Sequence, residues 1–410
     1  MKRIFWPVAG LLSLAACHSQ TSQTTPADTP EASQPPASSP AAVGSPGTAY
    51  QVYRGLLPGQ VDSITLHLVT APRSFNEVTG RFGSYYGADG HPYTLQGQPS
   101  AAPDSVLLLE TSLEKTADGH DTTWRLRRQP GRGDLVGMVA GRPLHLRLAP
   151  TAAGALSFVV RYFADSAAAF PQEAKSPVGH ISLQALVPVG GAPAPREALA
   201  TNIVRGLRGD TVAAQAVPAL ARLYQQQRQQ FVQAYREDAA STRPAPADTA
   251  GIGPYGPGLS YQDQSATYVL YQQGSLLSLG FFHYSFSGGA HGNYGTAGVS
   301  YDLRTGQPLG YDAIFLPTAA ARLPALLAQA VRPLVGLRPG EPLDKELLVQ
   351  QMPVTHNVFL TAGGVVFVYQ PYEIASYAQG EVRIFVPLAT LRPLLRPGLP
   401  LPEASGLAAR

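Results

Sequence analysis

The chain has 410 residues, 44% of them apolar, so it is long enough to bury more than one hydrophobic core. Only 14% of residues are charged, whereas the chain contains 41 glycines and 38 prolines, which favours a strand-rich and loop-rich protein over a helical bundle. The net charge of +3 falls to +1 (28 − 27) once residues 1–16 are removed. So small a charge, without a basic stretch interleaved with aromatic residues, argues against a nucleic-acid partner.

The N-terminus has the layout of a secretory signal. Lys2 and Arg3 precede an apolar stretch that ends in the small residues before Cys17. The segment 1–16 resembles the signal peptide of a bacterial lipoprotein, in which the cysteine is lipidated and becomes the first mature residue. Cys17 is the only cysteine, and lipidation would explain a lone thiol in an exported protein. The alternative is an ordinary signal peptide followed by a chance cysteine.

Acyl chains on Cys17 would be the membrane anchor, because no later stretch approaches 18 uninterrupted apolar residues. We therefore expect a protein of the bacterial cell envelope, lipid-anchored and periplasmic or in the outer membrane. Residues 17–48 are rich in Ser, Thr, Pro and Ala and have no aromatic residue before Tyr50, so they are predicted to form a disordered tether.

Residues 49–150 are predicted to form a small β-rich module, a barrel or a sandwich. Apolar and polar residues alternate over Asp62–Val69, and Gly80–Gly97 has the pattern of a hairpin that turns at Asp89-Gly90. Four further strand patterns follow before residue 150, and short strands at this spacing are typical of such modules.

Residues 151–404 mix strand and helix patterns, so the predicted fold class is α+β, with subdomains at about 151–245 and 259–400. The expected elements, in chain order, are strands at Ser157–Phe163 and Gly179–Pro188, a helix at about Thr211–Asp238, two strands joined near Gln273-Gly274, helices at about Pro324–Leu334 and Asp344–Gln351, and three C-terminal strands.

Three ordered motifs lie in the second half of the chain. They are the Gly-Gly-Ala-His turn of Gly288–His291, the Asp-Leu-x-Thr-Gly sequence of Asp302–Gly306 and the loop Tyr372–Gly380. With these motifs, residues at about 155–400 resemble the extracytoplasmic domain family of the lysozyme-sensing anti-sigma factor RsiV and the non-catalytic region of the peptidoglycan deacetylase PdaC. The resemblance implies an antiparallel sheet with a few helices, and it makes lysozyme a candidate partner.

The chain also departs from these relatives. It lacks a sigma-binding segment and a membrane helix, as well as the metal motifs of the deacetylase, so neither anti-sigma nor deacetylase activity is expected. Residues 151–410 contain 18 Lys and Arg against 16 Asp and Glu, a net charge of +2. Electrostatic complementarity to a strongly basic lysozyme would favour an acidic receptor, which weakens that candidate.

His291 is the residue on which the functional interpretation depends. In a catalytic interpretation it lines a glycine-rich cleft and works with Glu373 or Asp302. In a structural interpretation Gly288 and Gly289 adopt positive φ angles, and His291 hydrogen-bonds a nearby backbone group to hold the corner. Tyr372 and Glu373 have the same two readings, since a carboxylate there can bind a cationic group or cap the following turn.

Other catalytic and cofactor motifs are absent. No Gly-x-Ser-x-Gly elbow or phosphate-binding glycine loop occurs, and the closest histidine pair, His283 and His291, is eight residues apart. No metal or cofactor is therefore expected. Four aromatic residues at 281, 282, 284 and 286 occupy both faces of one strand, which predicts a buried strand and not a platform for a sugar.

The leading interpretation is a non-enzymatic, lipid-anchored envelope protein that binds another protein or a cell-wall component. The candidate binding or structural residues are those of the three motifs: Gly288, Gly289, His291, Asp302, Tyr372 and Glu373. The alternative is a peptidoglycan-modifying enzyme that uses His291 with Glu373 or Asp302.

Overall fold

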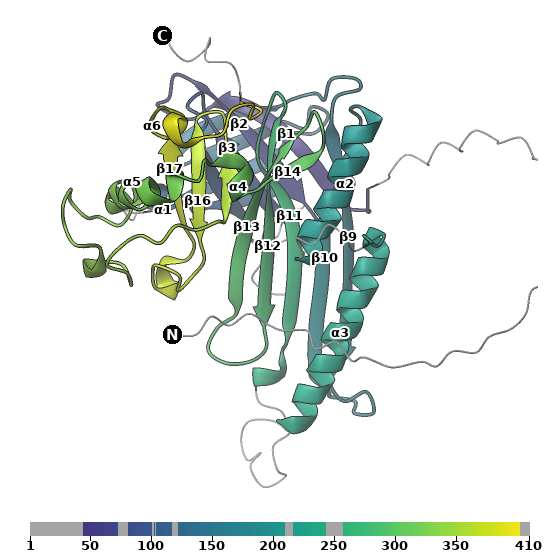
Figure 1. Ribbon diagram of the computed structural model, residues 1–410. Helices are drawn as coiled ribbons and strands as arrows, with labels where there is room; N and C mark the ends of the chain where they lie inside the picture. The colour runs from purple at the N-terminus through teal and green to yellow at the C-terminus, as the bar shows by residue number, and fades with distance from the viewer. Residues whose placement is uncertain are drawn as a thin grey trace, which may run out of the picture. The chain divides into compact units, whose positions relative to one another are not determined.

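The computed structural model describes residues 44–72, 81–100, 102, 104–116, 122–209, 216–242 and 257–401. These residues form a barrel, a six-stranded sheet and a three-stranded sheet with short helices (Figure 1), which confirms the predicted α+β class with an all-β module first. The predicted signal peptide, Cys17 and the tether as far as residue 43 lie outside the described residues.

The N-terminal module is a closed barrel of eight antiparallel strands. Of the two predicted forms, a barrel or a sandwich, the barrel is therefore the one found. Strand β8 pairs with β1, where Tyr53 lies opposite Leu148, and this pairing removes both free sheet edges. The strands are β1 Ala49–Leu56, β2 Ser63–Thr70, β3 Arg81–Tyr86, β4 Pro92–Gly97, β5 Ser105–Glu110, β6 Thr123–Arg128, β7 Leu135–Val139 and β8 Arg142–Leu148, with the short helix α1 Leu113–Thr116 after β5.

Alternation along the strands fills the barrel interior. Val106, Leu108 and Glu110 of β5 are buried while the residues between them are half-buried, as a period of two requires. The predicted hairpin is β3–β4, and Gly90 takes a φ of 69° in its turn. Trp124 of β6 is 2% exposed and packs on Tyr85.

The second layer is a six-stranded sheet with the order β14-β13-β12-β11-β10-β9. All of its neighbours are antiparallel except β10 and β11, which run parallel, because the two helices between them return the chain to the end where β10 began. Its strands are β9 Ser157–Ala168, β10 Val178–Val189, β11 Gln262–Gln273, β12 Leu276–Phe286, β13 Asn293–Asp302 and β14 Gln307–Leu309.

Two helices, α2 Pro193–Arg208 and α3 Leu220–Ser241, connect β10 to β11 and pack against that sheet. The prediction covered only the second of them, and α3 begins at Leu220, later than residue 211. Helix α2 was missed although its signals are ordinary: a proline opens it, Gly209 closes it at a φ of 73°, and its buried residues recur at helical spacing.

The third layer is the antiparallel sheet β15 Val358–Leu360, β16 Gly364–Tyr369 and β17 Val382–Pro387, in agreement with the three predicted C-terminal strands. Every residue of β16 is buried. The remaining helices and 3-10 turns are η2 Pro257–Leu259, α4 Tyr311–Ile314, α5 Ala319–Leu334, η3 Leu343–Lys345, η4 Tyr377–Gln379, α6 Leu388–Leu391 and η5 Arg392–Leu394.

The predicted helix at 344–351 was wrong. Only the 3-10 turn η3 forms there, and the backbone N–H of Leu347 makes one helical hydrogen bond to Leu343. The next N–H, that of Leu348, donates instead to the carbonyl of Ile374 in a distant loop. The N–H group that would have continued the helix is therefore used in a tertiary hydrogen bond to Ile374.

The barrel shares its core with the layers behind it. Val69 and Phe82 of the barrel belong to the hydrophobic core of the six-stranded sheet, and Tyr86 belongs to that of the three-stranded sheet. Buried His67 lies between two phenols, 2.8 Å from Tyr50 and 3.0 Å from Tyr86. Strands β2, β3 and β4 of the barrel lie against β11 of the six-stranded sheet, and the candidate site lies along this contact.

Candidate functional site

The Gly288–His291 turn is a compact corner at the start of β13. Gly288 and Gly289 take φ angles of 89° and 93°, as the structural interpretation requires. The His291 ring is exposed, and one tautomer satisfies both of its contacts: Nδ1 donates to the carbonyl of Gly292 (3.0 Å) and Nε2 accepts from the hydroxyl of Tyr372 (3.3 Å). The ring also stacks on Tyr377 with centroids 3.8 Å apart.

The structure does not bring His291 together with either predicted carboxylate. Asp302 lies at the far end of β13 and pairs with Arg304, with Oδ2 2.7 Å from Nη2. Burial alone would raise the pKa of Asp302, but the hydrogen bonds and charge of Arg304 hold it below its usual range. Glu373 instead accepts the backbone N–H of Gln370 at 2.9 Å, and partial burial raises its pKa.

Tyr372 has an unusual backbone. Its φ is 68°, one of two positive values at non-glycine residues in the described part of the chain, and the residue is 57% exposed. A tyrosine in this region is uncommon and costs conformational energy. Its ring lies 5.7 Å from that of Tyr377 and 6.3 Å from that of His291, so three of the motif side chains form one exposed aromatic cluster.

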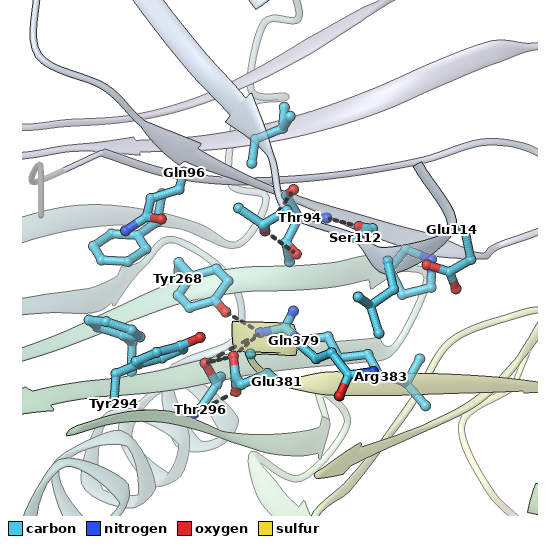
Figure 2. A pocket seen from close by; sticks show the side chains of 18 of the residues that line it. Thr94, Gln96, Ser112, Glu114, Tyr268, Tyr294, Thr296, Gln379, Glu381 and Arg383 are labelled. Carbon is cyan, nitrogen blue, oxygen red and sulfur yellow. Dashed lines mark hydrogen bonds and ion pairs between the residues drawn. The ribbon is translucent and has the colours of Figure 1, made fainter. Parts of the chain in front are cut away.

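A cleft of about 500 Å³ lies between the barrel wall and the two sheets (Figure 2). Thr94 and Gln96 of β4 form the barrel side, and Tyr268 of β11 and Thr296 of β13 come from the six-stranded sheet. Arg383 comes from β17 of the three-stranded sheet. Tyr377 lines the cleft as well, so the aromatic cluster of the corner adjoins it. The volume falls within the range of small-molecule sites.

Aromatic rings form much of the cleft wall. Phe82 of the barrel stacks on Tyr268 of the sheet at 5.3 Å and lies 5.2 Å from Phe282. Phe282 and Tyr284 both line the cleft. The predicted buried strand is thus buried at Phe281 and Phe282, but one side of it also faces a cleft that only the barrel completes.

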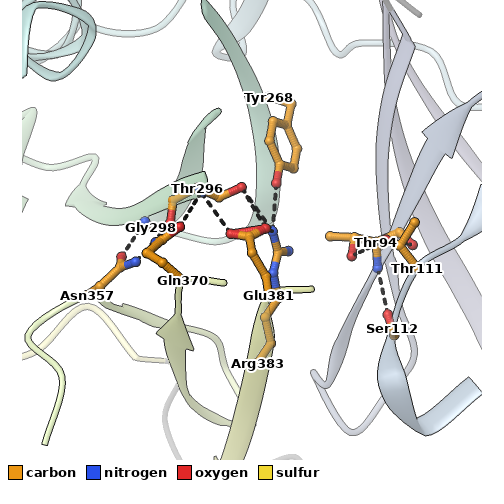
Figure 3. A network of polar contacts seen from close by, with 10 residues as sticks. All are labelled: Thr94, Thr111, Ser112, Tyr268, Thr296, Gly298, Asn357, Gln370, Glu381 and Arg383. Carbon is orange, nitrogen blue, oxygen red and sulfur yellow. Dashed lines mark hydrogen bonds and ion pairs between the residues drawn. The ribbon is translucent and has the colours of Figure 1, made fainter. Parts of the chain in front are cut away.

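An ion pair between Glu381 and Arg383 lies on the floor of the cleft (Figure 3). Glu381 accepts hydrogen bonds from the backbone N–H and the hydroxyl of Thr296, at 2.8 and 3.0 Å, and its Oε2 lies 3.2 Å from Arg383 Nη2. The same Nη2 donates to the hydroxyl of Tyr268 at 3.0 Å and to that of Thr296 at 3.3 Å. Burial alone would lower the pKa of Arg383, but Tyr268 and Glu381 outweigh it and the pKa lies above its usual value.

Only one nitrogen of Arg383 is used in this way. Among the described residues, Nη1 and Nε of Arg383 have no hydrogen-bond partner, although the side chain is only 18% exposed. Figure 3 shows the guanidinium group held at Glu381 and Thr296, with Thr94 and Ser112 of the barrel on the other side of the gap. Nη1 and Nε therefore remain able to donate to an anionic or polar group in the cleft.

Two amides behind the floor hold β13 in place. Asn357 accepts from the N–H of Gly298 and donates to the carbonyl of Thr296, both at 2.8 Å. Gln370 donates to the same carbonyl at 2.9 Å. These bonds tie the six-stranded sheet to the three-stranded one and fix the position of Thr296, on which the ion pair depends.

Sequence reasoning did not find Glu381 or Arg383. Glu381 directly follows the third motif, and two charged residues separated by a single valine in a strand pattern that is otherwise apolar were the available signal. The barrel side of the cleft had no comparable signal, because Thr94 and Gln96 are ordinary residues of an amphipathic strand.

Neither a metal centre nor a membrane-spanning helix is found in the described part of the chain. Its residues contain no group of three or more His, Cys, Asp or Glu side chains placed to hold a metal ion. Within the same residues, no helix has both the length and the apolar character needed to cross a bilayer.

No curated protein matches the sequence. A crystal structure of a DUF3298 family member from Bacteroides fragilis matches with a TM-score of 0.51 and 23% identity, covering 59% of this chain and 94% of that one. A DUF3298 family protein from Pseudomonas aeruginosa matches with a TM-score of 0.41 and 22% identity, covering 60% of this chain and 97% of that one.

The first of these structures shows a common fold. The family match itself is confined to the C-terminal part of the chain, which includes α5, the three-stranded sheet and both members of the ion pair. Residues 312–389 match the family described as "Protein of unknown function (DUF3298)".

Proposed function

We propose that this chain is a lipid-anchored protein of the bacterial cell envelope that binds a cell-wall glycan fragment bearing a carboxylate, without converting it chemically. The ligand would occupy the cleft between the barrel and the two sheets. The observation that carries the proposal is the guanidinium of Arg383 on the floor of an aromatic cleft. Its Nη2 is held by Tyr268 and Glu381, while Nη1 and Nε have no hydrogen-bond partner among the described residues.

The lining of the cleft suits a sugar. A pyranose ring has C–H faces that pack on aromatic rings and a rim of hydroxyl groups that need donors and acceptors. Phe82, Phe282 and Tyr294 offer ring surface, and Gln96 and Gln98 of the barrel offer amides. The side-chain amide of Gln96 forms no hydrogen bond with the described residues, so it is available to a ligand.

Arg383 suits a carboxylate on that sugar. Nη2 of Arg383 is engaged with Glu381, Tyr268 and Thr296, so the N–H groups of Nη1 are the ones that can form a charge-assisted hydrogen bond to a carboxylate oxygen. Glu381 balances the charge of Arg383 in the empty cleft and keeps its position fixed, so little ordering is needed when a ligand binds. An N-acetylmuramic acid unit has the required combination of sugar ring and carboxylate.

The envelope location comes from the N-terminal sequence, where Cys17 and the residues before it resemble a lipoprotein signal. The resemblance of residues at about 155–400 to the RsiV family supports a binding role and keeps lysozyme as a rival partner. The net charge of +2 over residues 151–410 disfavours a strongly basic protein, so the glycan is the proposed ligand.

Isothermal titration with paired sugars tests the proposal. The full chain is titrated with N-acetylmuramic acid and with N-acetylglucosamine, which lacks the lactyl carboxylate, while the products are monitored by mass spectrometry. The expected result is saturable binding that is tighter for N-acetylmuramic acid, roughly tenfold or more for one charged hydrogen-bonded contact, and no turnover.

Two variants locate the site. Gln96→Ala should weaken both sugars without affecting folding, and Arg383→Gln should remove the preference for the carboxylate. Gln225→Ala, an exposed glutamine on α3, is the matched control and should bind like the unmodified chain. Turnover of either sugar would overturn the non-enzymatic assignment, and saturable binding of lysozyme with no response to the sugars would overturn the choice of ligand.

A further inference from the structure

A second, separate pocket opens at one end of the barrel. Its volume is about 280 Å³, and it shares no lining residue with the cleft. The β1–β2 and β7–β8 connections contribute Leu57 and Ala140 to it, and the ring side chains of Tyr85 and Trp124 form part of its lining. The rest of the barrel interior is packed with side chains, so this end is where an eight-stranded barrel has room for a small ligand.

One oxygen of a buried carboxyl group in this pocket has no hydrogen-bond partner among the described residues. Glu110 is 3% exposed, and its Oε2 has no hydrogen-bond partner among the described residues, while Oε1 accepts the N–H of Ser112 at 3.3 Å. Burial raises the pKa of Glu110 and outweighs the contacts with Tyr85, Ser112 and Lys115, which lower it. An unpaired buried carboxyl oxygen is costly, and a ligand group that pairs with it would recover that free energy.

The charged residues around the pocket determine which kind of ligand group can pair with Glu110. Lys115 and Arg142 both line it, so they repel a ligand cation that would otherwise pair with Glu110. Burial raises the pKa of Glu110 to about 7, so both of its protonation states are populated near neutral pH. A hydroxyl group can donate to the carboxylate and accept from the carboxylic acid, so it is compatible with either state.

From the unpaired Oε2 of Glu110 at an aromatic barrel end, we infer that this pocket binds a small neutral molecule with an apolar body and one hydroxyl group. The hydroxyl pairs with Oε2 of Glu110, and the apolar body packs against Tyr85 and Trp124. This site is independent of the glycan cleft, and its failure would leave the proposed function unaffected.

Trp124 provides a direct probe of this site. The chain has two tryptophans, Trp6 and Trp124, so in the full chain carrying Trp6→Phe the only tryptophan lines the pocket. Its fluorescence is titrated at pH 7 with three compounds of one size: benzyl alcohol, toluene without the hydroxyl, and benzylamine with a cation. Benzyl alcohol is expected to give a saturable change and to bind more tightly than either of the others.

Substitutions at Glu110 and Leu57 then test the contacts. Glu110→Leu should weaken benzyl alcohol roughly tenfold and leave toluene unchanged or tighter. Leu57→Phe narrows the pocket and should weaken both compounds, and it keeps the test valid if the variant at residue 110 does not fold. Glu197→Leu, at an exposed carboxylate on α2, is the matched control.

Three results would overturn the inference. They are an unchanged Trp124 signal with all three compounds, equal affinities for benzyl alcohol and toluene, and an affinity for benzyl alcohol that is the same in Glu110→Leu.

Discussion

Gly363, in the β15–β16 turn, lies directly against the backbone of Asp89, in the β3–β4 turn of the barrel. A Cβ atom at Gly363 would lie 1.7 Å from the carbonyl oxygen of Asp89, and one at Gly90 would lie 2.6 Å from the nitrogen of Gly363. Both obstacles are backbone atoms, so neither can swing aside as a side chain would. The barrel and the small sheet therefore meet through two turns that exclude any side chain at the contact.

Gly363→Ala should destabilise the protein by about 1–3 kcal/mol, because the turns must separate to accept the methyl group. Gly310→Ala is the control, since a Cβ atom there meets nothing within 4 Å and the φ of −80° is ordinary. Urea denaturation followed by circular dichroism measures both variants. Equal midpoints would show that the two turns are not in close contact in solution.

The ion pair of the cleft should make its own contribution to stability. Arg383→Met leaves Glu381 largely buried without its cation and should cost about 3 kcal/mol. The double variant Glu381→Leu/Arg383→Met should recover part of this loss, because no unpaired charge remains and the N–H of Thr296 keeps its bond to Gln370. Chemical denaturation measures the stability of both variants. A double variant that is less stable than Arg383→Met would contradict this expectation.

Glu110 should make stability depend on pH in one defined window. Its pKa rises from 4.5 to about 7 on folding, chiefly through burial, so the folded state binds the proton more tightly than the unfolded state. This stabilisation is complete below pH 4.5 and is lost as the pH rises to about 7, a change of about 3 kcal/mol. Glu110→Gln cannot titrate, so its stability relative to the unmodified chain should increase across this window.

Denaturation midpoints at pH 4.5, 6 and 8 measure that difference for Glu110. If the difference in midpoint between Glu110→Gln and the unmodified chain were the same at all three pH values, the carboxyl group would have the same pKa in the folded and unfolded states.

His291→Ala tests the role of the corner. The exposed ring makes two hydrogen bonds and stacks on Tyr377, so its loss should cost about 1 kcal/mol of stability. Binding of N-acetylmuramic acid should weaken only slightly, since His291 does not line the cleft. Thermal denaturation measures the stability, and calorimetry measures the binding of N-acetylmuramic acid. Loss of a measurable catalytic activity with unchanged stability would instead support the enzyme interpretation.

Local pattern was enough to predict much of the fold. The β3–β4 hairpin, the β11–β12 pair and the three C-terminal strands all follow from alternation bounded by turn residues, which is a property of neighbouring residues. The helix predicted at 344–351 failed because the N–H of Leu348 pairs with Ile374, a partner 26 residues away that local pattern does not reveal.

The candidate site could likewise be predicted only in part. The sequence by itself determined the mixed α+β class, the all-β module and the glycine corner at residue 288, because strand period and positive φ depend on adjacent residues. Only the tertiary structure decided that Asp302 and Glu373 pair with Arg304 and Gln370 instead of His291, and that Arg383, Thr296 and Thr94 line one cleft. Each of those three residues comes from a different sheet or barrel strand, so their meeting depends on how the layers pack and has no counterpart in sequence spacing.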